Sequence, residues 1–192
     1  MKSMRKHSDK HAEVAGNNLR ALTQRMHDAA ENQQFAKDMI TGEVSPKKYA
    51  IYLFNQHPQY NLLEQLGLMH DIVDVRIAPK IAEDYRELWE DYGPEQPPVL
   101  PVVAEYMDHL MSIKDDPKKL MAHIYVRHMG DLSDGQIIAK NAPGTGRMYH
   151  HENAKELKES IRAKCDDSMA EEANLCFDYA TKLFEQMAEI EE

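Results

Sequence analysis

The stretch of the chain best placed to do chemistry is residues 125–136, YVRHMGDLSDGQ, where two glycines interrupt a run of good helix formers. Each glycine inside a helix costs about 1 kcal/mol relative to alanine. A helix tolerates that cost where a flat group must approach its backbone or where the helix must bend. A helix–turn–helix connection at Gly130-Asp131 accounts for the same pattern, and periodicity alone does not separate the two interpretations.

A second candidate is the pair His27 and Glu31, which stand one helical turn apart. A carboxylate at this spacing can reach the imidazole ring, although a histidine on the apolar face of a helix is more often a hydrogen-bonded core residue. Basic side chains form a third group, because Arg20 lies two turns before His27 while Lys158 and Arg162 are one turn apart. Such side chains are usually solvated, but an arginine can also grip a carboxylate with two parallel hydrogen bonds.

These residues fall within an all-helical pattern. The spacing of apolar residues predicts helices over about 18–41, 47–66, 77–92, 102–113, 117–139, 153–164 and 168–189. Pro58 is expected to kink the second helix or to break it near Asn55. Residues 93–101 hold four of the nine prolines and form a connector. The chain is therefore predicted to be one helical domain, residues 17–192, after a mobile tail, residues 1–16.

The composition favours a soluble helical domain and excludes other classes. Only 8 glycines and 7% aromatic residues argue against a β-sandwich or barrel. A formal net charge of -10 disfavours non-specific binding to nucleic acid or to an anionic membrane surface. No run approaches the roughly 18 apolar residues of a membrane span, and the basic N-terminus lacks the apolar stretch of a secretory signal. Cys165 and Cys176 are spaced for neither zinc nor a redox pair, and reduced thiols fit a cytoplasmic protein.

Three blocks, in order along the chain, resemble the haem oxygenase family. Residues 122–136 resemble the family's signature, AHxYxRYLGDLSGGQ, and residues 27–32, HDAAEN, resemble its proximal HxxAEN motif. Residues 171–173, 177 and 183–185 resemble its final helix. The resemblance extends from about Leu19 to Glu189, which is nearly the whole chain after the tail.

The resemblance implies a helical bundle in which haem is sandwiched between a proximal helix and a kinked distal helix. His27 would be the proximal iron ligand and Glu31 the partner of its other ring nitrogen, since haem-ligating imidazoles commonly donate their second N–H to a carboxylate or carbonyl. The distal helix would bend at Gly130, so that its backbone lies against the porphyrin. Gly135 and Phe177 would line the same pocket.

The resemblance also assigns proton delivery to polar residues of the distal side. Asp131 corresponds to the family's distal aspartate, which holds a water chain rather than touching iron and can thereby deliver a proton. Arg127 and Tyr60 match positions that join this network. The catalytic residues expected from the resemblance are thus Asp131, Arg127, Tyr60 and Gly130.

Haem carries two propionates, and the resemblance places Arg20, Lys158 and Arg162 beside them. Tyr125 matches a tyrosine that can hydrogen-bond a propionate. The chain departs from the family at Asp134, which stands where the family's SGGQ run has its first glycine. Because its neighbours are intact, Asp134 is expected to point outward and to change little. The alternative is that its carboxylate narrows the distal pocket and strengthens proton delivery.

The implied activity is the oxidative cleavage of haem to biliverdin, with the α isomer as the family default, carbon monoxide and ferrous iron. Haem would be both substrate and cofactor, and O2 would be the oxidant. With no reductase domain in the sequence, electrons would come from ferredoxin or a flavoprotein reductase. Ferredoxins are acidic, so the basic residues near the haem edge would form the docking patch. A downstream bilin reductase is a further candidate partner.

Two other functions remain open. A haem-binding or haem-buffering protein without turnover would need His27 but not Asp131, Gly130 or Arg127. A di-iron carboxylate bundle requires paired Glu-x-x-His motifs, and the sequence contains none.

Overall fold

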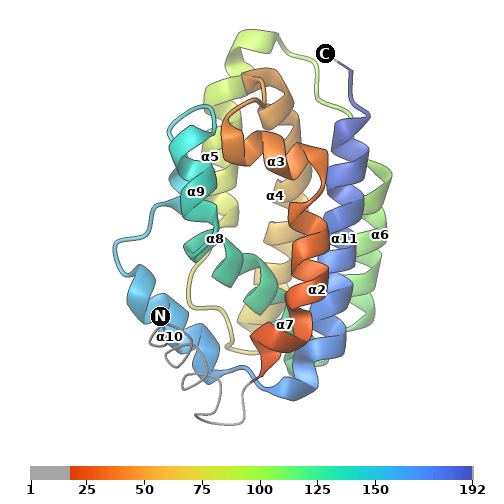
Figure 1. Cartoon of the computed structure of the whole chain (residues 1–192), viewed down its shortest axis with the longest axis vertical. Helices are drawn as coiled ribbons and strands as arrows, with labels where there is room; N and C mark the ends of the chain where they lie inside the picture. Colours follow the sequence, from red (N-terminus) through yellow and green to blue (C-terminus); the bar gives the residue numbers. More distant parts are fainter. Residues whose placement is uncertain (1–17, 192) are drawn as a thin grey trace, which may run out of the picture.

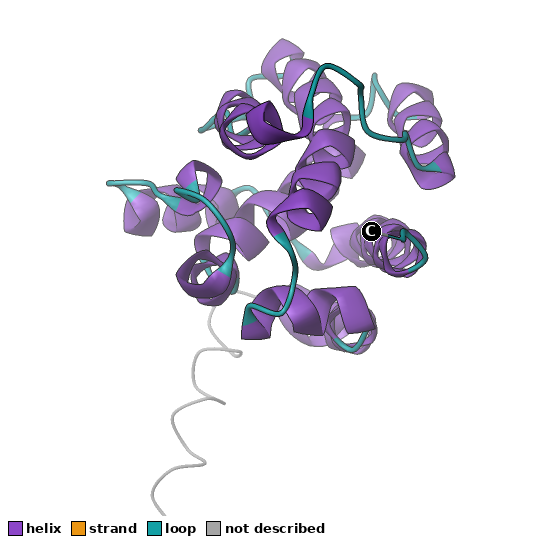
Figure 2. Cartoon of the chain, turned by 90° about the horizontal axis from the view of Figure 1, so that it is seen from above, coloured by secondary structure: helices purple, strands orange, loops and turns teal. Residues whose placement is uncertain are grey.

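The helices form largely where the apolar periodicity predicts them, and the predicted all-α class is confirmed. The computed structural model describes residues 18–191, and this part of the chain consists of helices and loops without a β-strand (Figure 1, Figure 2). The predicted tail, residues 1–16, lies outside the described residues. The α-helices are α2 (Leu19–Glu31), α3 (Gln34–Thr41), α4 (Pro46–Met69), α5 (Ala78–Trp89), α6 (Pro101–Ser112), α7 (Pro117–Ile124), α8 (Gly130–Leu132), α9 (Gly135–Asn141), α10 (Ala154–Ala163) and α11 (Ala170–Ala188). Shorter elements are 3-10 helices at Glu90–Tyr92, Arg147–Tyr149 and Asp167–Met169, and the π-helical stretch η2 at Tyr125–Met129.

The chain marks several helix ends with the residues expected there. The side chains of Ser45 and Asp116 each accept a hydrogen bond, at 3.1 Å, from the backbone N–H three residues later. Pro46 and Pro117 follow in the first turn, where a missing N–H has no helical partner to lose. Gly42 ends α3 with a φ of 79°, a left-handed conformation that glycine adopts without strain.

Helix α4 is the central element of the bundle. Its buried side chains lie on all sides of the helix, as expected for a helix enclosed by others. It packs against α5, α6 and α7, while α11 packs against α2, α3, α6 and α7 (Figure 1). One core cluster is built around residues such as Tyr52 and Leu53, and the other around residues such as Leu63 and Leu120. The bundle therefore fixes α2 and the segment after α7 relative to one central helix.

Of the two outcomes predicted at Pro58, a kink or a break near Asn55, the break is wrong, because α4 runs unbroken from Pro46 to Met69 with Pro58 inside it. Side-chain amides supply hydrogen bonds to the backbone around the proline. Asn55 donates to the carbonyl oxygens of Ile51 and Pro98, at 2.9 and 3.0 Å, and Gln59 donates to the carbonyl oxygen of Asn55 at 2.8 Å. Tertiary packing and these bonds outweigh the local cost of the proline.

The helix predicted over 117–139 is not continuous, and its irregular turns lie on either side of Gly130 rather than at it. Gly130 has helical torsions, φ -57° and ψ -49°. The irregular turns precede it, in the π-helical stretch Tyr125–Met129, and the helix then ends at Ser133, with φ -113° and ψ -85°. A π-helical insertion widens the helix by one residue per turn and is common at functional sites. Periodicity does not distinguish such a wide turn from a regular one.

Glu64 of α4 is a fully buried carboxylate that organises the start of α5. It accepts hydrogen bonds from the backbone N–H groups of Ile77 and Ala78, at 2.9 and 3.2 Å, and lies 3.3 Å from Arg76 Nε. His128 Nε2 lies 3.0 Å from its other side. A negative charge at a helix N-terminus is stabilised by the aligned peptide dipoles. Glu64 therefore connects α4, the start of α5 and the π-helical stretch Tyr125–Met129.

We expect Glu64→Gln to lower the free energy of unfolding by about 3 kcal/mol, because it removes the charge from a buried network whose other members remain. Urea denaturation of the purified protein measures this change. The matched control is Glu43→Gln at an exposed carboxylate, with an expected change below about 0.5 kcal/mol. A loss below about 1 kcal/mol for Glu64→Gln would contradict the role given to this residue.

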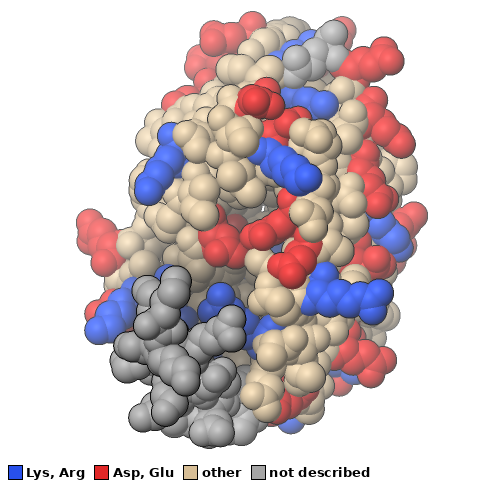
Figure 3. Space-filling model, viewed as in Figure 1, with Lys and Arg blue, Asp and Glu red and all other residues tan. Residues whose placement is uncertain are grey.

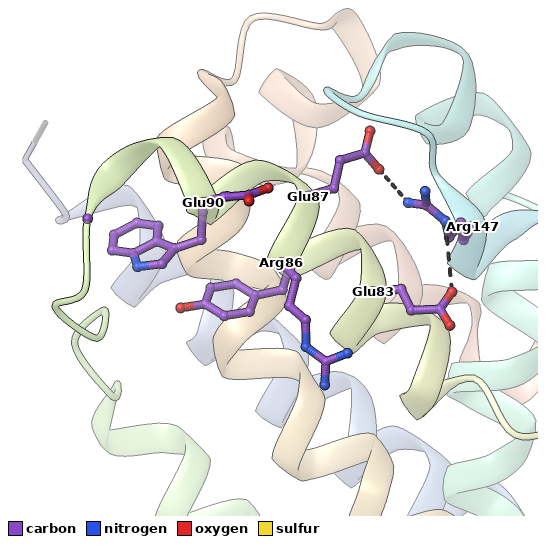
Figure 4. A pocket seen from close by; sticks show the side chains of 8 residues that line it. Glu83, Arg86, Glu87, Glu90 and Arg147 are labelled. Carbon is purple, nitrogen blue, oxygen red and sulfur yellow. Dashed lines mark hydrogen bonds and ion pairs between the residues drawn. The ribbon is translucent and has the colours of Figure 1, made fainter.

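A hollow on the outer face of α5 is occupied by charged side chains that pair with one another (Figure 4). Arg147 forms ion pairs with Glu87, with Glu83 at 3.8 Å and with the buried Asp84 at 3.2 Å. These contacts tie the loop before α10 to α5. We interpret this hollow as structural, because its arginine is already engaged by three carboxylates.

Two further expectations concern the cysteines and membranes. Cys165 and Cys176 are both free thiols, one partly buried and one buried, as predicted. Within the described residues, no helix has the length and apolar character that crossing a membrane requires.

Candidate active site

The candidate site lies where α2 faces the segment between α8 and α9. Helix α2 presents His27 with its side chain 29% exposed. His27 Nε2 lies 3.3 Å from Glu31 Oε1 and 2.9 Å from Asp134 Oδ2. Phe177 of α11 contacts the imidazole edge-on, with 5.5 Å between the ring centroids. The face seen in Figure 3 is hollowed in this region, and acidic side chains gather at the edge of the hollow.

Asp134 does not point outward as expected. Its carboxylate is within hydrogen-bonding distance of the imidazole nitrogen that faces the distal segment. Its side chain nevertheless stays 56% exposed, so solvent still reaches this contact. The turn at Ser133 directs Asp134 across the hollow, and that turn is the feature sequence periodicity missed.

The predicted contact between Glu31 and His27 is present, but at a different nitrogen from the one expected. Glu31 approaches Nε2, which also faces Asp134, whereas Nδ1 lies 3.5 Å from both Gln24 Nε2 and Asp28 Oδ1. Burial raises the pKa of Glu31, and the neighbouring His27 opposes that rise. The imidazole therefore has polar neighbours at both nitrogens, three of them carboxylates.

The two glycines of the distal segment serve different purposes. A Cβ added at Gly130 would meet no atom within 4 Å, so the backbone there borders open space. A Cβ added at Gly135 would come within 2.7 Å of the Tyr149 ring. Gly130 thus leaves room for a flat group against the helix, while Gly135 is required by the packing of Tyr149.

Asp131 and Tyr60 form the polar centre of the distal side. The Tyr60 hydroxyl, from α4, donates a hydrogen bond of 2.6 Å to Asp131 Oδ2. Burial raises the pKa of Asp131 to about 7, although Tyr60, His128 and Arg127 all act to lower it. The Asp131 carboxyl can therefore hold a proton near neutral pH, which is the property a general acid needs.

Arg127 is buried without a carboxylate partner among the described residues. Its guanidinium donates to the side-chain oxygens of Gln59 and Gln56, at 2.9 and 3.2 Å, and to the Tyr106 hydroxyl at 3.1 Å. It also lies 4.4 Å from the Tyr106 ring centroid and 5.3 Å from that of Tyr60. Arg127 is thus held beside Tyr60 by amides and aromatic faces.

The two glutamines and Tyr106 were missed in the sequence. The sequence does contain a signal for the two glutamines, because Gln56, Gln59 and Tyr60 recur at helical spacing inside a largely apolar helix. Polar groups at buried positions are normally hydrogen-bonded to one another. Tyr106 gave no comparable signal, since it stands on another helix, α6.

Two of the predicted propionate-binding residues, Arg20 and Arg162, lie close enough to Tyr125 to act on its hydroxyl. Burial raises the pKa of Tyr125, while the charges of Arg20 and Arg162 and a hydrogen bond with Thr23 lower it. These two arginines, from α2 and α10, therefore act on the same hydroxyl. Within residues 18–191, Arg20, Lys158 and Arg162 form no ion pair.

Comparison with known proteins agrees with this geometry. The model of the haem oxygenase family matches residues 14–186. The chain belongs to the haem oxygenase family. Haem oxygenase 2 of the mouse, Mus musculus, is 26% identical over 201 aligned residues, which cover 88% of this chain and 64% of that protein. The chain thus spans less than two thirds of the mammalian relatives that it matches. The haem oxygenase of Pyropia yezoensis is 28% identical, over 89% of this chain and 84% of that protein.

Solved haem oxygenase structures share the fold. Haem oxygenase-2 from Synechocystis, determined in complex with haem and NO, superposes with a TM-score of 0.74 at 26% identity, over 88% of this chain and 83% of that one. Haem oxygenase-1 from the same cyanobacterium, in complex with haem, gives a TM-score of 0.76 at 24% identity, over 88% and 89% of the two chains. The arrangement of α2, α4 and the α7–α9 segment is therefore a haem oxygenase fold.

Proposed function

We propose that this chain is a haem oxygenase that opens haem to biliverdin, carbon monoxide and ferrous iron, with the α isomer as the expected product. The observation that carries the proposal is that His27 Nε2 faces Asp134 of the segment 125–136, in which Asp131 is hydrogen-bonded to Tyr60 of α4. A ligating imidazole and a proton-holding carboxyl are the two groups that such a reaction asks of the protein.

The residues present fit haem. His27 offers an imidazole nitrogen, Gly130 borders open space, and Phe177 provides an aromatic edge beside the imidazole. Arg20 and Arg162 provide cations on one side of the site, where two propionates require them. The contacts of His27 Nε2 with Asp134 and with Glu31 must open before that nitrogen can bind iron.

Each residue then has a defined task. Bound haem supplies the iron that activates O2 and the porphyrin that is cleaved. His27 binds the iron through Nε2, and Asp28, which faces Nδ1, sets the orientation of the imidazole. Asp131 holds the proton that the reaction consumes, and Tyr60 positions its carboxyl. Arg127 packs on the ring of Tyr60 and holds it in place. The basic residues Arg20, Lys158 and Arg162, with Tyr125, would bind the propionates and thereby orient the haem.

The electron donor belongs to the same proposal. Ferredoxin is the favoured donor, with a flavoprotein reductase as the alternative, because Arg20 and Arg162 are exposed and unpaired within the described residues on a chain of net charge -10. Opposite charges speed the encounter with an acidic partner. A bilin reductase would be the partner that consumes biliverdin. The two free thiols favour a reducing compartment, which we take to be the cytoplasm.

The test is to add haemin to the purified protein, record the visible spectrum, and then supply ferredoxin, its reductase and NADPH in air. A sharp Soret band that decays into the broad red absorption of biliverdin is the expected result. A stable Soret band with several electron donors would favour the haem-buffering alternative instead. A spectrum that keeps the broad Soret band of free haemin would overturn both the oxygenase and the haem-buffering functions.

A further inference from the structure

A second cluster of metal-ligating side chains lies outside the candidate haem site, where α6, α7 and α11 meet. It consists of His109, His123 and Glu172, one residue from each helix, and one ligand atom from each lies within 4.8 Å of the other two. His109 Nε2 and His123 Nε2 both hydrogen-bond to the same carboxylate oxygen, Glu172 Oε1, the latter at 2.9 Å. Three residues from distant parts of the sequence thus direct their donor atoms to one point.

The carboxylate of the cluster faces two imidazoles rather than a permanent cation. Glu172 Oε1 contacts Nε2 of both His109 and His123. No arginine or lysine forms an ion pair with it within residues 18–191.

The surroundings of His123 resemble the outer shell of a metal site. Its other ring nitrogen, Nδ1, lies 2.7 Å from the Tyr106 hydroxyl, and that hydroxyl is 3.7 Å from Cys176 Sγ. The Tyr106 hydroxyl can accept a hydrogen bond from Nδ1–H of His123 and donate one to the sulfur of Cys176. In that tautomer of His123, the Nε2 lone pair is free to bind a metal. Metal-binding histidines commonly have their second nitrogen fixed in this way.

Solvent reaches two of the three residues in the cluster. His123 is fully buried, whereas the side chains of Glu172 and His109 are 13% and 19% exposed. A bound ion can therefore keep a water ligand.

We propose that His109, His123 and Glu172 bind a divalent transition-metal ion, best matched by Zn2+, in a site independent of haem. Two imidazoles, one carboxylate and a water complete the four-coordinate shell that zinc prefers. With metal–ligand distances of about 2.1 Å, tetrahedral ligands are about 3.4 Å apart. The His123–Glu172 pair, now at 2.9 Å, needs to open by only about half an ångström. The ion replaces the two imidazole protons that now bind Glu172 and ties three helices together.

The first test is titration of the haem-free full-length chain with Zn2+ by calorimetry. The wild type should bind one equivalent of Zn2+. His109→Gln should lower the affinity for Zn2+ about 100-fold or more, because losing a ligand costs at least as much as losing an outer-shell partner. The variant keeps a hydrogen-bond donor for Glu172 and changes a partly exposed residue. His70→Gln is the matched control, since His70 is also half-buried and hydrogen-bonds the Lys114 carbonyl.

A second control separates this site from the haem site. His27, Asp28 and Glu31 also place ligand atoms within 4.8 Å of one another, so His27→Ala is titrated in parallel. Unchanged binding in His27→Ala and His70→Gln supports the proposal. Equal binding by wild type and His109→Gln, loss of binding in His27→Ala, or no stoichiometric binding at all would overturn it.

The absorption of Co2+ bound to the wild type provides a readout that depends on no variant. Intense d–d bands between about 500 and 650 nm indicate the four-coordinate site that zinc proteins provide. Only the weak bands of six-coordinate Co2+ would refute the proposed geometry. Because neither measurement uses haem, failure here leaves the proposed oxygenase activity untouched.

Discussion

Replacing Asp131 by asparagine is expected to slow haem cleavage by roughly 10²-fold or more, the lower end of what a general acid contributes. An amide keeps the size of the side chain and can still accept the hydrogen bond from Tyr60. It cannot take up and release a proton. Haem affinity should not change, because Asp131 stands on the distal side and His27 is the proposed ligand. The decay of the Soret band in a single turnover measures the rate.

The same substitution should stabilise the folded protein above neutral pH. Burial raises the pKa of Asp131 from 3.8 to about 7, so the unfolded chain loses this proton before the folded chain does. Wild-type stability therefore falls as the pH rises from about 4 to about 7, relative to the asparagine variant. The difference in the free energy of unfolding between the variant and the wild type grows by about 1.4 kcal/mol at most for each pH unit in this range. Above it, the difference stays constant.

Thermal denaturation at pH 4 and pH 8 tests the predicted stability difference between wild type and Asp131→Asn. We expect equal melting temperatures at pH 4 and a higher one for Asp131→Asn at pH 8. A variant that loses turnover and is also less stable at pH 8 would indicate that Asp131 serves to hold the fold rather than to hold a proton.

The fold was accessible to sequence reasoning because its main determinants are local. Apolar periodicity and the proline-rich connector are both properties of short, contiguous stretches of the chain. Two errors arose where tertiary contacts override local preference. The helix continues through Pro58 because Asn55 and Gln59 satisfy neighbouring carbonyl oxygens, and the distal helix changes pitch before Gly130 rather than at it.

The site was less accessible for a related reason. Resemblance brought Tyr60, Asp131 and Arg127 into one network, and the structure places them together. The resemblance could not predict that Asp134 turns toward His27, since that position is a glycine in the family's pattern. A side chain's direction after an irregular turn depends on torsions such as those of Ser133, which no periodicity encodes.

Asp134→Gly and His27→Ala should have opposite effects on haem binding. Loss of the imidazole removes the proposed iron ligand, so His27→Ala should lose the sharp Soret band and bind haem about 100-fold more weakly or worse, by about 2.7 kcal/mol. Loss of the Asp134 carboxylate frees His27 Nε2 from a contact of 2.9 Å. A hydrogen bond to a partly exposed group contributes about 1 kcal/mol, so Asp134→Gly should bind haem several-fold more tightly. Haemin titration followed at the Soret maximum measures both affinities.

The double variant decides whether the carboxylate acts through His27. If Asp134 competes with iron for the imidazole nitrogen, Asp134→Gly should have no effect on haem affinity once His27 is alanine, because the contact it removes no longer exists. Asp28→Asn serves as the comparison. Asp28 faces the other ring nitrogen, 3.5 Å away, and orients the imidazole rather than competing for Nε2, so its loss should not tighten haem binding. An equal gain from Asp134→Gly in both backgrounds would mean that the carboxylate repels the haem propionates or narrows the pocket instead. No gain in either background would mean that the contact with His27 opens without measurable cost when haem enters.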